Sequence, residues 1–142
     1  MLKIIVATHG KFSQELIHSA FMILGEKDNV SAITFLPGEG SEDLIAKYQE
    51  ALKDVSADDQ VIFLVDLFGG SPFNAAARIV SEYGDRYRLI AGVNLAMVIE
   101  LCSSFVEDLD QLVDSVVAQG KESVVEFVMP TQDVDMDLDL EG

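Results

Sequence analysis

The stretch QVIFLVDLFGGSPFNAAAR, at positions 60–78, constrains the fold more than any other part of the sequence. It opens with the apolar run Val61–Val65, which lacks polar alternation and is typical of a strand buried on both faces of a parallel sheet. Asp66 ends this run, and the double glycine Gly69-Gly70 follows. Ser71-Pro72 then predicts a helix N-cap with proline at the first helical position. In open α/β sheets, ligands bind at such a place, where a strand ends in a loop before a helix.

Strand and helix patterns alternate along residues 1–130, which we expect to form one domain. Strands are predicted at 3–7, 30–35, 61–65 and 88–91, and helices at 12–24, 42–52, 72–83, 95–103 and 109–119. The pattern predicts an α/β fold: a doubly wound, mainly parallel four-stranded sheet of order 2-1-3-4 with helices on both faces. A last strand over 123–129 has no clear return path to this sheet. We expect it to join antiparallel or to pair with another subunit.

Charge and cysteine content narrow the function classes. The chain has 9 basic and 25 acidic residues and a formal net charge of −16, which disfavours nucleic-acid binding through a basic face. Acidic residues also alternate along 131–142, a tail that we expect to be disordered. The single cysteine, Cys102, excludes an internal disulfide and fits a reducing compartment. No apolar run approaches membrane-spanning length and no signal-peptide layout is present, so a soluble, cytoplasmic protein is expected.

The predicted strand order brings two polar side chains together. His9 follows the first strand and Asp66 the third, and strands 1 and 3 are neighbours, so the two side chains should share one crevice. A carboxylate bonded to one imidazole nitrogen fixes the tautomer and leaves the other nitrogen as a nucleophile. Helix N-termini after Gly10 and Gly70 would supply N–H donors to an anion. Taken singly, such a histidine is more often a capping residue and such an aspartate a turn residue; together they predict a histidine that accepts a phosphoryl group.

Other chemistries have less support in the sequence. The Gly-Gly-Ser-Pro-Phe stretch lacks the second glycine of a serine hydrolase elbow, and no Walker A or G-x-G-x-x-G pattern occurs. The two histidines, His9 and His18, have no second ligand at helical spacing, so neither a metal site nor a cofactor is expected. The loop Thr8–Ser13 is similar to the phosphate loop of flavodoxins. A flavodoxin-like, FMN-binding electron carrier and a non-catalytic regulatory module of the same fold therefore remain the alternatives.

Four blocks of the sequence resemble the IIA component of the mannose/fructose/sorbose family of the bacterial sugar phosphotransferase system (PTS). They are IIVATHGKFSQELIHSA, FLPGEGSEDLIAKY, VIFLVDLFGGSPFNAAARIV and LIAGVNLAMVIEL, and the resemblance spans about residues 3–128. It implies that His9 takes a phosphoryl group from the carrier protein HPr and passes it to a IIB component, with Asp66 orienting the imidazole. It also implies a homodimer that exchanges the strand Ser123–Met129. We expect IIB to be a separate polypeptide that leads to the membrane components IIC and IID, which select the sugar.

The remaining expected site residues fall into two groups. The phosphoryl-binding candidates are Thr8, Gly10, Gly69, Gly70 and Ser71, and the resemblance places Ser71 close to the phosphoryl group. A transfer that excludes water needs an apolar rim against the partner protein. The rim candidates are Leu36, Pro37, Leu67 and Phe68, of which Leu67-Phe68 stand where members of the family often have Thr-Trp.

Overall fold

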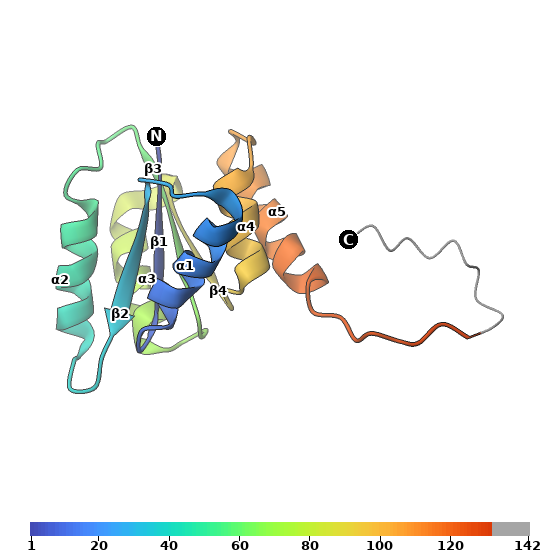
Figure 1. The fold of residues 1–142 in the computed structure, drawn as a ribbon. Coiled ribbons are helices and arrows are strands. Elements are labelled where there is room, and N and C mark those ends of the chain that lie inside the picture. Colours follow the sequence, from blue (N-terminus) through green and yellow to red (C-terminus); the bar gives the residue numbers. More distant parts are fainter. Residues whose placement is uncertain (132–142) are drawn as a thin grey trace.

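The computed structural model describes residues 1–131 and shows a single α/β layer structure (Figure 1). Its elements up to Glu122 alternate as the sequence predicts, apart from one additional 3₁₀ turn, and no strand follows α5 within the described residues. In chain order they are β1 (Leu2–His9), α1 (Phe12–Leu24), β2 (Val30–Phe35), α2 (Ser41–Leu52), β3 (Gln60–Val65), α3 (Ser71–Tyr83), η1 (Gly84–Arg86), β4 (Tyr87–Ala91), α4 (Leu95–Ser103) and α5 (Leu109–Glu122).

The four strands form one parallel sheet of order β2-β1-β3-β4, which confirms the predicted topology. In the centre of the sheet, Ile5 of β1 pairs with Ser31 of β2 and with Phe63 of β3. Because all the strands run the same way, the loops that follow β1, β2 and β3 meet at one edge of the sheet, the lower edge in Figure 1. This edge carries His9 and Asp66.

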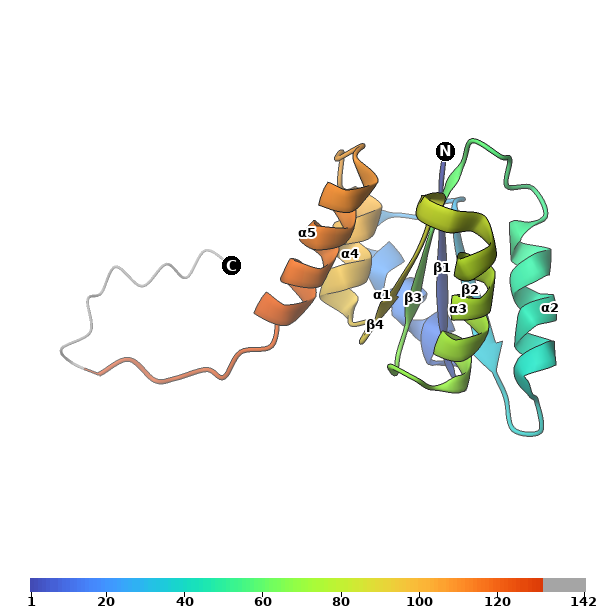
Figure 2. The same ribbon diagram turned by 180° about the vertical axis from the view of Figure 1, so that it is seen from behind.

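Helices cover both faces of the sheet, with α1, α4 and α5 on one side and α2 and α3 on the other (Figures 1 and 2). Successive side chains of a strand point to opposite faces. Accordingly, Ile4 and Val6 of β1 pack in the core under α1, α4 and α5, whereas Ile5 and Ala7 pack in the core under α2 and α3. The apolar run Val61–Val65 is fully buried because both of its faces are covered.

Two helices begin one residue earlier than predicted. Ser41 and Ser71 are the first helical residues of α2 and α3, and the N-cap positions belong to Gly40 and Gly70. Neither serine therefore acts as a side-chain cap. At the start of α2 it is the Asp43 side chain that forms a capping hydrogen bond: its carboxylate accepts from the N–H of Gly40 at 2.8 Å.

The prediction that helix α5 stops before Gly120 is wrong, because the helix continues to Glu122. Gly120 is buried where α5 crosses α4. A Cβ atom at this position would lie 2.6 Å from the Cγ and Sδ atoms of Met97. The glycine is present to allow close packing of the two helices rather than to end one of them.

The segment Ser123–Met129 runs away from the body of the domain in an extended form (Figure 1). Within residues 1–131 it pairs with no strand, and its apolar side chains are exposed: Val124, Val125, Phe127, Val128 and Met129. An antiparallel strand exchanged between subunits therefore stays a prediction. The predicted disorder of the acidic tail concerns residues that, apart from Thr131, lie outside those described.

Candidate functional site

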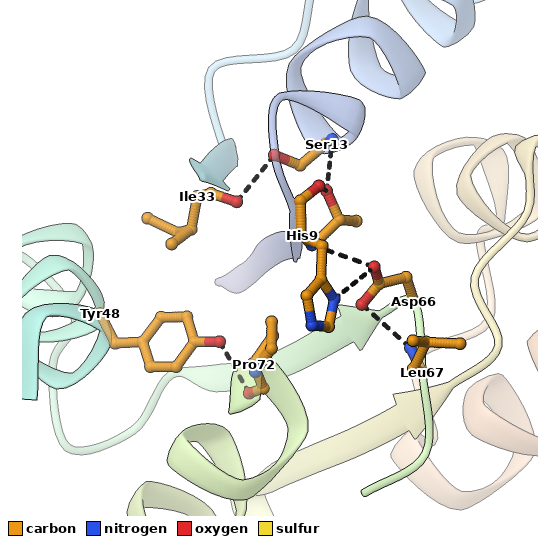
Figure 3. A network of polar contacts seen from close by, with 8 residues as sticks. His9, Ser13, Ile33, Tyr48, Asp66, Leu67 and Pro72 are labelled. Atoms are coloured by element: carbon orange, nitrogen blue, oxygen red, sulfur yellow. Dashed lines mark hydrogen bonds and ion pairs between the residues drawn. The ribbon is translucent and has the colours of Figure 1, made fainter. Parts of the chain in front are cut away.

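His9 and Asp66 meet at the carboxyl ends of β1 and β3. The Nδ1 atom of His9 lies 3.0 Å from Oδ2 of Asp66, and the backbone N–H of His9 donates to the same oxygen at 3.0 Å. The other carboxylate oxygen, Oδ1, accepts a hydrogen bond of 2.9 Å from the N–H of Leu67. The imidazole remains 45% exposed, whereas the carboxylate is only 16% exposed. Asp66 is thus fixed by backbone donors, and it fixes the ring (Figure 3).

This contact determines which nitrogen of His9 is available for reaction. An ionised carboxylate can only accept hydrogen bonds, so the nitrogen that faces it, Nδ1, carries the proton. In the neutral imidazole the lone pair is then on Nε2. A nucleophile held in one tautomer by a carboxylate is the arrangement expected for covalent catalysis by histidine.

The N-terminus of α3 lies against the same ring. A Cβ atom at Gly70 would lie 3.0 Å from Cε1 of His9, so a side chain at this position would require the imidazole to shift. Within residues 1–131, the N–H groups of Ser71 and Phe73 have no acceptor, and Pro72 between them has no N–H. These two donors and the positive end of the helix dipole suit an anion beside the ring. The hydroxyl group of Ser71 also makes no hydrogen bond within the described part of the chain.

Two of the residues predicted to bind the phosphoryl group have other partners. The hydroxyl group of Thr8 is fully buried; it accepts from the N–H of Ser13 at 2.7 Å and donates to the carbonyl of His9 at 3.1 Å. The N–H of Gly10 donates to the carbonyl of Phe35 at 2.8 Å, and Gly10 has a positive φ of 59°. Both residues therefore support the β1–α1 turn.

The double glycine turns the chain from β3 into α3. Gly69 has a φ of 81°, which favours glycine, and its carbonyl accepts a hydrogen bond of 3.0 Å from the Asn74 side chain. Asn74 also donates through its backbone N–H to the carbonyl of Gly70 at 2.9 Å. The glycine loop is therefore held by the first turn of the helix that it introduces.

The predicted rim residues lie on the loops that flank the site. Leu67 and Phe68 directly follow Asp66 and are exposed, Phe68 to 84%. The Phe68 ring lies beside the Phe73 ring, at 4.8 Å between ring centroids. Leu36, which is half-buried, and the exposed Pro37 begin the loop after β2, on the other side of His9.

Three residues around the site were not predicted as part of it. The Phe35 ring meets the imidazole edge-on at 5.7 Å, and its place as the last residue of β2, in register with His9, could have indicated this contact. Ser13 donates from its hydroxyl group to the carbonyl of Ile33 at 2.7 Å. Tyr48, from the apolar face of α2, reaches the first turn of α3 (Figure 3). His18 is exposed on α1 beside Glu15.

Comparison with known proteins agrees with this geometry. The family model described as PTS system fructose IIA component matches residues 3–117. The chain belongs to this family. The assignment confirms the resemblance found in the sequence, and it identifies a IIA component of the sugar phosphotransferase system.

Individual IIA proteins show how far the similarity extends. The mannose-specific EIIAB component of Escherichia coli is 44% identical over 125 residues, which are 87% of this chain and 38% of that protein. The fructose-specific EIIA component of Bacillus subtilis is 45% identical over 103 residues, 72% of this chain and 70% of that one. The structure of the mannose/sorbose specific IIA subunit from Enterococcus faecalis superimposes with a TM-score of 0.84 at 32% identity. The match covers 91% of this chain and 96% of that one. The chain thus spans well under half the length of the E. coli relative.

Two further observations concern other kinds of site. Among residues 1–131, no group of three or more histidine, cysteine, aspartate or glutamate side chains is placed to hold a metal ion. None of the helices in this part of the chain combines the length and apolar character needed to cross a membrane.

Proposed function

We propose that the chain is a phosphoryl carrier in which Nε2 of His9 accepts a phosphoryl group from phosphorylated HPr and donates it to a IIB component. The observation that carries this proposal is the 3.0 Å contact between Nδ1 of His9 and Asp66, which leaves Nε2 as the nucleophile beside the N-terminus of α3. Family membership supports the same role.

The transfer is an in-line displacement. The lone pair of Nε2 forms a bond to phosphorus while the bond from phosphorus to the donor's leaving atom breaks, and the leaving atom keeps that electron pair. The imidazole gains positive charge, which the Asp66 carboxylate balances through the proton on Nδ1. The oxygens of the phosphoryl group face the N–H groups of Ser71 and Phe73. The second transfer, to IIB, repeats these steps in reverse order.

A labelling experiment with radioactive phospho-HPr tests the role of His9. The parent protein and His18→Ala should take up one phosphoryl group per chain, whereas His9→Ala should take up none. His18→Ala is the matched control, because it removes the other histidine from the exposed face of α1. Absence of label from the folded parent would favour a regulatory module instead, and a purified protein that carries flavin would favour the electron carrier.

The partner proteins dock on the rim formed by Leu36, Pro37, Leu67 and Phe68. Support for this surface comes from its position around His9 and from the exposure of Leu67 and Phe68. Apolar side chains at the rim exclude water while the phosphoryl group moves between proteins, which prevents its loss by hydrolysis.

The same proposal includes a cytoplasmic homodimer built from the domain 1–130, with residues 131–142 as an acidic tail. Five exposed apolar side chains between Val124 and Met129 support the exchange of this segment as an antiparallel strand. An unpaired apolar strand in solvent tends to pair with the edge of another sheet. In a symmetric dimer, each subunit's strand can pair with the sheet of the other, so the backbone groups of both strands are hydrogen-bonded.

A further inference from the structure

We infer that Tyr48 is a positioning residue for phosphoryl transfer, which acts by holding the first turn of α3 against His9. The inference rests on the function proposed above. It concerns a side chain of α2, a helix that makes no hydrogen bond to the imidazole within the described residues.

Tyr48 reaches across the layer that contains α2 and α3. Its side chain is fully buried, and its hydroxyl group donates a hydrogen bond of 2.8 Å to the carbonyl of Pro72 (Figure 3). The ring itself is fixed edge-on against Phe63 of β3, with 5.2 Å between centroids. The packing of the ring thus fixes the position of the hydroxyl group next to Pro72, the second residue of α3.

The hydroxyl group of Tyr48 also keeps its proton, and so remains a hydrogen-bond donor. Burial, together with the negative charge of Asp66, raises the pKa of Tyr48 well above its ordinary value. The group therefore stays protonated at every pH at which the protein would work. Because it is the only polar atom of the side chain, its hydrogen bond is the specific contribution of tyrosine over phenylalanine at this position.

The turn that Tyr48 holds is the one that meets the imidazole. Within residues 1–131, Pro72 lies between the unpaired N–H groups of Ser71 and Phe73. It is two residues after Gly70, where an added Cβ atom would lie 3.0 Å from Cε1 of His9. A shift of this turn would move the anion donors and the helix end relative to Nε2. Displacements of about 1 Å can slow a reaction by about 10²-fold when they misalign reacting groups.

The hydrogen bond is not required for the fold in the way that the ring is. The carbonyl of Pro72 lies within α3 and has a regular helical acceptor role as well. Tyr48→Phe keeps the ring and its packing, so the variant should fold with the position of the turn changed. The matched control is Ile79→Val, which weakens packing of the same helix in the same core, one turn before its other end.

The test measures the initial rate of phosphoryl uptake from phospho-HPr over a range of donor concentrations, at a temperature at which every variant is folded. We expect Tyr48→Phe to lower the maximal rate about ten-fold with the KM for the donor unchanged, because the partner surface is intact. Ile79→Val should keep both parameters. In a second measurement, amide NMR signals of Ser71 and Phe73 should shift in Tyr48→Phe and stay in place in Ile79→Val.

Two results would overturn this inference while leaving the proposed function intact. In the first, the parent chain is labelled and Tyr48→Phe has the same maximal rate as the parent. In the second, Ile79→Val loses as much rate as Tyr48→Phe. Unmoved signals of Ser71 and Phe73 in Tyr48→Phe would overturn it too, even if the rate were lower. A folded parent that accepts no phosphoryl group would overturn the proposed function, and the inference with it.

Discussion

The imidazole of His9 is fixed by two neighbours that act on different atoms. Asp66 holds Nδ1 through a hydrogen bond, and the absence of a side chain at Gly70 leaves room for the ring near Cε1, which would lie 3.0 Å from an added Cβ atom. The first contact sets which nitrogen is free, and the second brings that nitrogen to the N-terminus of α3. Each contact can be removed separately, which gives two predictions for single residues.

Replacing Asp66 by asparagine should slow phosphoryl uptake by about 10²-fold or more, because the imidazole is no longer held in its reactive orientation. The amide can donate to Nδ1, which favours the tautomer with the proton on Nε2, and it no longer balances charge on the ring. The uptake rate from phospho-HPr measures this effect. Asp59→Asn, a buried aspartate before β3, is the control and should keep the parent rate. An Asp66→Asn variant as fast as the parent would mean that Asp66 is only structural.

Replacing Gly70 by alanine should slow uptake about ten-fold or more, because the new Cβ meets Cε1 of His9 at 3.0 Å and must displace the ring. The backbone of Gly70 has a φ of −74°, so alanine is not strained there and the stability should change little. Gly40→Ala is the matched control: Gly40 is also a helix N-cap, and its Cβ would meet nothing within 4 Å. Equal uptake rates in the two variants would contradict the close approach at Gly70.

At the scale of elements, the β3–α3 loop has two functions. Its inner part, Gly69-Gly70, brings α3 to the imidazole, while its outer part, Leu67-Phe68, is exposed at the rim. This division predicts that the outer side chains affect partner binding and leave the stability of the fold unchanged.

Phe68→Ala should raise the KM for phospho-HPr several-fold, by loss of an aromatic side chain from the contact surface. Its midpoint of thermal unfolding should stay close to that of the parent, since the ring is 84% exposed. Phe105→Ala is the control: this ring is 98% exposed in the α4–α5 connection and should affect neither quantity. An unchanged KM with a lower unfolding midpoint for Phe68→Ala would make Phe68 a structural residue.

At the scale of the molecule, the segment after α5 should hold the dimer together. Burial of a large apolar side chain contributes roughly 1.5–3 kcal/mol, so exchange of Val124, Val125, Phe127 and Val128 would stabilise a dimer by several kcal/mol. A chain that ends at Glu122 should therefore sediment as a monomer or aggregate. A chain that lacks only 131–142 should sediment as the parent does. A folded, dimeric chain ending at Glu122 would show that this segment does not hold the dimer.

The sequence predicted the sheet order and the pairing of His9 with Asp66, because both follow from the alternation of buried strands and amphipathic helices. It did not predict which of the candidate phosphoryl-binding groups form hydrogen bonds within the protein. Thr8 and Gly10 bond within the β1–α1 turn, and no local pattern indicates this. Nor did the sequence indicate a role for Tyr48, because the contact of this side chain with Pro72 depends on how α2 and α3 pack. The predicted strand Ser123–Met129 is not formed in the single chain, and its pairing with another subunit stays a prediction.

The most direct test of the account is the position of the phosphoryl group on the imidazole. Protein labelled with ¹⁵N-histidine would be phosphorylated by phospho-HPr and observed by ¹⁵N and ³¹P NMR. The account predicts direct phosphorus–nitrogen coupling at Nε2 of His9, with Nδ1 still protonated and bonded to Asp66. Coupling at Nδ1 of His9, or at either nitrogen of His18, would contradict it.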